Sequence, residues 1–273
     1  MARAHRDRLV TAARVLGFAG ALAIVAAVAV KAIRDAPPRD LDWPLLIPAV
    51  AAALGWWVLL ARGWALLMSG RWTRTDAATW CRTQALRYLP GGIWAPASRL
   101  AVAEGGAADR LRTVAAENIG ALVAGLAVGG LGLALAGRVA WAPLVLAPLA
   151  PALLARVRLL PARAPATVPT YLAAFAGYAI AAILAQAAVS GWHDVALVAG
   201  AAGIAWAAGL VVIVAPSGLG VREVVYVGLL AEAFGKGEPA AGAVVLRLVT
   251  IVAELVVLIV TARALRRREP ANG

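Results

Sequence analysis

Apolar residues dominate the chain in long runs, and short polar links separate these runs. A helix needs about 20 apolar residues to cross a ~30 Å hydrocarbon core. The pattern predicts eight spans, at residues 12–33, 43–68, 115–136, 138–156, 170–190, 195–214, 219–234 and 240–262. The fourth span carries three prolines and is predicted to be kinked, and the seventh is short. We therefore predict an all-α, polytopic membrane protein with a single integral membrane domain over residues 1–273.

The first apolar run follows a basic start, a feature that a cleavable signal peptide shares. The run extends from residue 12 to 33, and no clean A-x-A cleavage site precedes a soluble segment. We therefore expect a retained first helix instead of a removed leader.

Arginines gather in alternate links, and the positive-inside rule assigns such links to the cytoplasm. The clusters comprise Arg71, Arg74, Arg82 and Arg87, then Arg110 and Arg112, then Arg156, Arg158 and Arg163. This alternation predicts a protein of the cytoplasmic membrane with both termini in the cytoplasm. Residues 88–100 have arginines on both sides, so this segment is predicted to enter the membrane and return to the same face.

The composition agrees with a membrane protein, since 63% of the residues are hydrophobic, 15% are charged and the mean hydropathy is +0.83. The net charge of +12 could suggest nucleic acid. However, the arginines fall in short clusters between apolar runs, so no nucleic-acid partner is predicted. Tryptophans including Trp43, Trp64, Trp72, Trp141 and Trp192 lie near predicted span ends, which indicates an interfacial belt.

Motifs of familiar catalytic chemistry are missing from the sequence. There is no G-x-S-x-G, no H-E-x-x-H and no His/Cys cluster with metal-ligand spacing. The segment "AFGKGEP" is not a P-loop, because Leu230 stands where that motif requires glycine. Cys81 is the only cysteine, which excludes an internal disulfide. We predict no catalytic residue, no cofactor, no metal ion and no ATP-driven pump.

Two segments interrupt the apolar pattern with proline and glycine, namely "RYLPGGIWAPASRL" and "APSGLGVREVV". The first contains Pro90, Gly91, Gly92 and Arg99, and the second contains Pro216, Gly218, Gly220 and Arg222. Irregular backbone at membrane depth costs several kcal/mol for each unsatisfied group unless protein or cavity water satisfies it. Paired interruptions of this kind point to a substrate site near the bilayer midplane in transporters. Ordinary kinks or surface turns are the alternative.

The second interruption offers backbone groups that suit an anion. We expect Ser217 to cap a helix that starts near Gly218. A helix N-terminus carries free amides and about half a positive charge, which favours phosphate or carboxylate.

Charged residues in or beside the spans, namely Arg99, Glu117, Glu223, Arg247 and Glu254, should face a cavity or one another. Each central charge costs about 2.5 to 3.5 kcal/mol on insertion scales. We hypothesise that Glu117 pairs with Arg99 and that Glu223 pairs with Arg247. Arg247 and Glu254 are about 10 Å apart along one helix face, too far for direct pairing. Structural ion pairs without a substrate are the alternative.

The stretches "YLPGGIWAPASR" and "PSGLGVRE", together with the later span arginine, resemble the transmembrane-domain family of lysylphosphatidylglycerol synthases, which are flippase-like membrane proteins. The resemblance covers about residues 45–262. It implies broken or re-entrant helices around a lipid-headgroup cavity, and movement of lipid between leaflets. The matching residues are Tyr88, Pro90, Gly91 and Arg99, then Glu117, then Pro216, Gly218, Gly220 and Glu223, and finally Arg247. Ser217 departs from the two glycines that often follow this proline in the family.

The resemblance implies a lipid transporter that moves an anionic or glycosylated lipid, such as a phospholipid or polyprenyl lipid. The cytosolic aminoacyl-transferase domain of bifunctional members is not found in this chain, so we expect no lipid aminoacylation. Its expected partners are the lipid headgroup and the bilayer. A homo-oligomer and a separate lipid-synthesising enzyme are further partner hypotheses, and small residues in "GALVAGLAVGGLGLALAG" favour close helix packing. The alternatives are a membrane-embedded subunit of a lipid-modifying enzyme and a substrate-free assembly partner.

Overall fold

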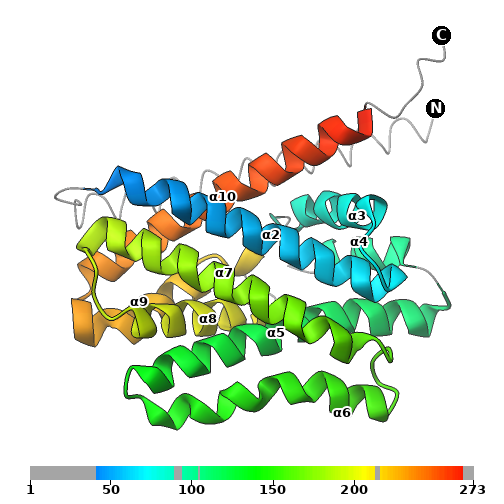
Figure 1. Cartoon of the computed structure of the whole chain (residues 1–273), viewed down its shortest axis with the longest axis horizontal. Coiled ribbons are helices and arrows are strands. Elements are labelled where there is room, and N and C mark those ends of the chain that lie inside the picture. The colour runs from blue at the N-terminus through cyan, green and yellow to red at the C-terminus, as the bar shows by residue number, and fades with distance from the viewer. Residues whose placement is uncertain (1–40, 89–93, 104, 213–215, 267–273) are drawn as a thin grey trace.

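A computed structural model describes residues 41–88, 94–103, 105–212 and 216–266. This part of the chain is helical and contains no β-strand, which confirms the predicted all-α fold. The helices run roughly along the long axis of the molecule, except for α10, which crosses the bundle obliquely (Figure 1).

Five helical segments in the described part are long and apolar enough to cross a membrane. They are Trp43–Ser69, which includes α2 (Leu46–Ser69); Ala107–Leu135, which is α5; Val139–Arg156, which joins the 3-10 helix η3 (Val139–Leu149) to α6 (Ala150–Arg156); Ala164–Ser190, which is α7; and Gly237–Thr261 within α10 (Gly237–Arg266). These segments correspond to the predicted second, third, fourth, fifth and eighth spans. The predicted first span lies outside the described residues.

The predicted sixth and seventh spans form a hairpin in the structure. They correspond to α8 (Val195–Val211) and α9 (Val221–Phe234), whose lengths of ~26 Å and ~21 Å are below the hydrocarbon thickness. The rings of His193 and Phe234, at the outer ends of the two helices, lie 5.4 Å apart. The pair therefore enters and leaves at one end of the molecule instead of making two separate crossings.

A second set of short helices lies at the other end. It comprises α3 (Arg74–Gln84), its 3-10 extension η2 (Ala85–Tyr88) and α4 (Trp94–Val102), with α3 beside α4 (Figure 1). Residues 89–93, which connect η2 to α4, lie outside the described part. The inner end η2 contacts η4 (Pro216–Gly218), which lies between α8 and α9. The two sets of short helices thus approach each other from opposite ends of the bundle.

Small residues bring α5 and α8 close together, as the glycine-rich run predicted. A Cβ added at Gly132 would lie 2.6 Å from the carbonyl oxygen of Ala196, and one at Gly203 would lie 2.7 Å from that of Gly125. Such separations leave room only for hydrogen at these positions. These glycines are therefore used for packing within the chain.

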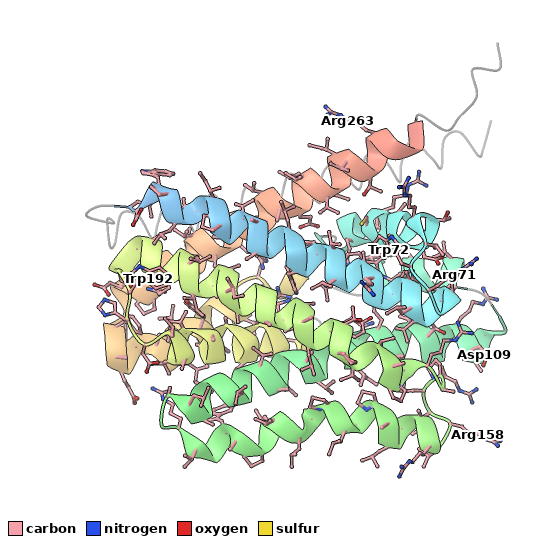
Figure 2. The ribbon with its side chains drawn as sticks, in the orientation of Figure 1. Arg71, Trp72, Asp109, Arg158, Trp192 and Arg263 are labelled. Carbon is pink, nitrogen blue, oxygen red and sulfur yellow. The ribbon has the colours of Figure 1, made fainter. Side chains whose placement is uncertain are left out.

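The two ends of the bundle differ in their residues. Arg71, Trp72 and Arg158 lie at one end, called here the arginine-rich end, and Trp192 lies at the other (Figure 2). Exposed Trp43, Trp72 and Trp192 suit the predicted interfacial belt. The prediction was wrong for Trp64, which is 1% exposed within α2, because α2 turns this face toward the protein core.

Candidate functional site

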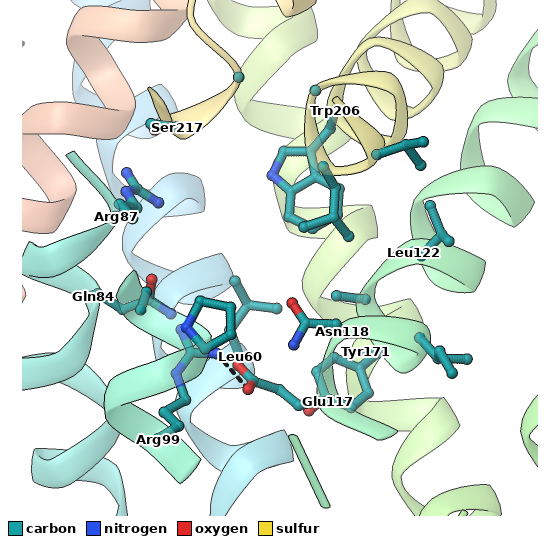
Figure 3. A pocket seen from close by; sticks show the side chains of 18 of the residues that line it. Leu60, Gln84, Arg87, Arg99, Glu117, Asn118, Leu122, Tyr171, Trp206 and Ser217 are labelled. Atoms are coloured by element: carbon teal, nitrogen blue, oxygen red, sulfur yellow. Dashed lines mark hydrogen bonds and ion pairs between the residues drawn. The ribbon is translucent and has the colours of Figure 1, made fainter. Parts of the chain in front are cut away.

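A cavity of about 500 Å³ lies where the two sets of short helices meet α2, α5 and α7. Its wall combines charged and polar side chains with aromatic rings, and three arginines each lie over a tryptophan ring: Arg87 over Trp57, Arg99 over Trp80 and Arg222 over Trp206. Figure 3 shows Arg87, Arg99 and Ser217 across from Trp206 and Leu122. Such a combination suits a ligand that has a polar head and an apolar body.

Arg99 and Glu117 form a buried ion pair in the cavity wall, as we hypothesised from the sequence. Arg99 lies on α4 and Glu117 on α5, and both are about 5% exposed or less. The indole Nε1 of Trp80 donates to Glu117 Oε1 at 2.6 Å, and Arg99 Nε donates to Thr83 Oγ1 at 3.2 Å. These bonds satisfy both charged groups inside the protein, which a buried pair requires.

Arg87 forms a second ion pair, which the sequence had not indicated. Its Nη2 lies 2.6 Å from Oε2 of Glu254 on α10, and Glu254 is 2% exposed. The Arg87 guanidinium also lies 4.7 Å from the ring centroid of Trp57. Hydropathy marked Glu254 as a buried charge, but its partner stands 167 residues earlier in the chain.

Arg247 of α10 contacts the second interruption. Its Nη2 donates to the carbonyl oxygen and to Oγ of Ser217, at 3.3 and 3.4 Å. Its Nε lies 3.9 Å from Glu223 Oε1, so the hypothesised pair is present as a longer contact. Arg247 and Glu223 line a small space next to the main cavity, whereas Ser217 lines the main cavity itself.

Ser217 does not cap α9, which corrects our expectation. Helix α9 begins at Val221, and its N-cap is Gly220 with φ 82°. The Gly220 amide donates to Oε2 of Glu223 at 2.8 Å, so the protein's own carboxylate occupies this helix N-terminus. Ser217 adopts a left-handed conformation with φ 55° and accepts hydrogen bonds from Arg247. The side chain of Glu223 therefore takes the place that we had expected an anion to occupy.

The remaining predicted site residues are distributed as follows. Gly218 lines the cavity, with φ 68°. Tyr88 ends η2 and Pro216 begins η4, and neither side chain belongs to the described part. Pro90 and Gly91 lie outside the described residues. The structure therefore brings Arg99, Glu117, Ser217 and Gly218 to one cavity wall.

Arg222 also lines the cavity, although we had noted it only as part of the second interruption. Its guanidinium carbon lies 5.1 Å from the ring centroid of Trp206 on α8. The sequence pattern that could have identified Arg222 is an arginine that follows two glycines at a helix break. At such a break a long side chain can fold back along the backbone. Within the described residues, no group of three or more His, Cys, Asp or Glu side chains could hold a metal ion.

We compared the chain with protein-family models, with curated proteins and with solved structures, and none of them matches. The resemblance to the lysylphosphatidylglycerol synthase transmembrane family thus remains a prediction from the two signature stretches.

Proposed function

We propose that this protein moves an anionic or glycosylated lipid between the two leaflets of the membrane. The observation that carries the proposal is a cavity with arginines in its wall, at the meeting point of helices that enter from opposite ends. Polar groups at membrane depth are costly, and they commonly mark substrate pathways in membrane proteins. Broken helices around such a site are a recurrent design in transporters.

The depth of the cavity supports this proposal. Glu117 lies ten residues (~15 Å) into α5 from the arginine-rich end. Arg247, which holds Ser217, lies ten residues (~15 Å) into α10 from the other end. A polar headgroup in the cavity would thus lie far from both aqueous phases.

The cavity wall also supports access from the side of the bundle. Val211, at the end of α8, lines the cavity and is 63% exposed. Part of the cavity wall therefore lies at the outer surface of the helical bundle. In the proposed mechanism the headgroup enters the cavity while the acyl chains remain in the bilayer, and arginines replace part of the hydration shell of the headgroup.

The test is lipid movement in vesicles reconstituted with the purified protein. Fluorescent phospholipids in the inner leaflet become accessible to a membrane-impermeant quencher only if they cross the membrane. We expect movement with the wild type, slower movement with Arg247→Gln, and the wild-type rate with Arg138→Gln, whose guanidinium pairs with Glu232 at the surface, at 3.0 Å. If vesicles with folded wild-type protein move lipid no faster than empty vesicles, the proposal fails.

A substrate-free assembly partner is the second candidate, and the two internally compensated pairs favour it. Arg99 with Glu117 and Arg87 with Glu254 neutralise each other without any ligand. Such a protein would move no lipid and would co-purify with a stoichiometric partner chain. The enzyme alternative would instead convert a labelled lipid into a new chemical species.

A further inference from the structure

The charges around the cavity do not balance. Three arginines line it, namely Arg87, Arg99 and Arg222. Glu254 and Glu117 pair with the first two. Among the described residues, no carboxylate lies within 4.0 Å of the Arg222 guanidinium, and no group hydrogen-bonds to its buried Nε. Arg222 also lines the adjoining small space with Arg247 and Glu223, whose carboxylate lies 3.9 Å from Arg247 Nε, so two arginines there share one carboxylate. Among the described residues, one positive charge around the cavity is therefore left over.

The backbone around Arg222 is shaped to hold this side chain. A Cβ added at Gly209 would lie 2.6 Å from Arg222 Nε, and one at Gly218 would lie 2.8 Å from the same atom. Gly209 and Gly218 thus provide the space in which the guanidinium lies against Trp206. Stacking on an indole orients the guanidinium without neutralising its charge. The planar group is held in place while its donors stay available for a ligand.

We propose, building on the function proposed above, that Arg222 binds the phosphate of a phosphodiester-linked lipid headgroup. A phosphodiester carries one negative charge, which balances the single uncompensated arginine. A neutral glycolipid would leave Arg222 unpaired, and a diphosphate would bring more negative charge than the cavity wall compensates. A charge that is buried without a partner is costly in either case. The arginine fork also matches two phosphate oxygens at once.

The rest of the cavity fits the same ligand. A volume of about 500 Å³ lies within the range of small-molecule sites, roughly 300 to 1,000 Å³. Trp56, Trp57 and Tyr171 line it with aromatic surface, which suits the glycerol carbons next to the phosphate of a lipid. Asn118 lines it as well; its Nδ2 donates to the Val114 carbonyl oxygen at 2.8 Å, and its Oδ1 can accept a hydrogen bond from a headgroup hydroxyl.

Lipid binding to the purified full chain tests this inference. Native mass spectrometry would measure retention of phosphatidylglycerol in competition with an equimolar neutral diacylglycerol glycolipid and with a polyprenyl diphosphate. We expect the phosphodiester lipid to be preferred, and Arg222→Gln to reduce that preference about 10- to 100-fold. Arg222→Lys should keep part of the preference, and Arg138→Gln should keep all of it. Displacement of the lipid by excess inorganic phosphate would mean that the site binds the phosphate group alone, without the glycerol and acyl chains.

A stability measurement keeps the inference testable without the ligand. Among the described residues, no carboxylate loses its ion-pair partner when Arg222 is replaced. Replacing Arg99, in contrast, removes the ion-pair partner of Glu117. We therefore expect Arg222→Gln to preserve or raise the Tm of lipid-free protein, while Arg99→Gln lowers it. A large fall in Tm for Arg222→Gln, or an unchanged lipid preference, would overturn the assignment of Arg222. Arg222-dependent binding without lipid movement would instead refute transport and leave the binding site standing.

Discussion

Arg87 Nη2 lies 2.6 Å from Glu254 Oε2, and this ion pair ties the inner end η2 to the middle of α10 across 167 residues of sequence. Glu254 is 2% exposed, so the Arg87 guanidinium compensates a charge that is shielded from solvent. The pair also sets the position of Arg87 at the cavity wall. Its removal should affect both folding and the site.

Arg87→Gln should destabilise the protein by about 3 to 5 kcal/mol, because it removes a charged partner of the buried Glu254 carboxylate. The double variant Arg87→Gln/Glu254→Gln should recover much of that loss. Thermal unfolding of the purified protein in detergent measures both. Additive effects of the two single substitutions would mean that the residues do not interact.

The Arg99 and Glu117 pair allows a structural role to be separated from a functional one. Arg99→Gln alone should lower the Tm, whereas Arg99→Gln/Glu117→Gln should restore most of it, because no buried charge then remains unpaired. If Arg99 also contacts the headgroup, the stable double variant should still move lipid more slowly in vesicles. A double variant with the wild-type transport rate would assign the pair to folding alone.

Gly132→Ala should destabilise the contact between α5 and α8 by about 1 to 3 kcal/mol, because the new methyl group would meet backbone atoms that cannot move aside easily. Gly55→Ala in α2 is the matched control, since nothing lies within 4 Å of the Cβ it would introduce. That substitution should be neutral or slightly stabilising, as alanine favours helix. Denaturation midpoints of the two variants provide the comparison, and equal midpoints would contradict the close packing.

Cysteine labelling tests the predicted orientation. In a Cys81→Ser background, Arg158→Cys lies at the arginine-rich end, and Lys236→Cys lies between α9 and α10 at the opposite end. A membrane-impermeant maleimide added to intact cells should label Lys236→Cys but not Arg158→Cys. The reverse pattern would mean that the arginine-rich end faces outward, and labelling of both would contradict a membrane between them.

Local sequence identified the features that depend on neighbouring residues. The long helices follow from apolar runs, because a lipid-exposed segment must satisfy its own backbone hydrogen bonds. Glycine and proline marked the second break, where Ser217 and Gly218 adopt positive φ. The pairing of Arg99 with Glu117 could be hypothesised since the two residues are only 18 positions apart. The hairpin of α8 and α9 could not, because hydropathy does not report the direction that a chain takes after a break.

The sequence by itself determined that the protein is a helical membrane protein. It also determined where the long spans of the described part lie and which charged residues had to be buried. Only the tertiary structure decided which carboxylate neutralises which arginine, and therefore that Arg222 has no such partner among the described residues. The reason is physical. Hydropathy acts residue by residue along the chain, whereas the compensation of a buried charge depends on atoms within about 4 Å, and folding brings these together from distant segments.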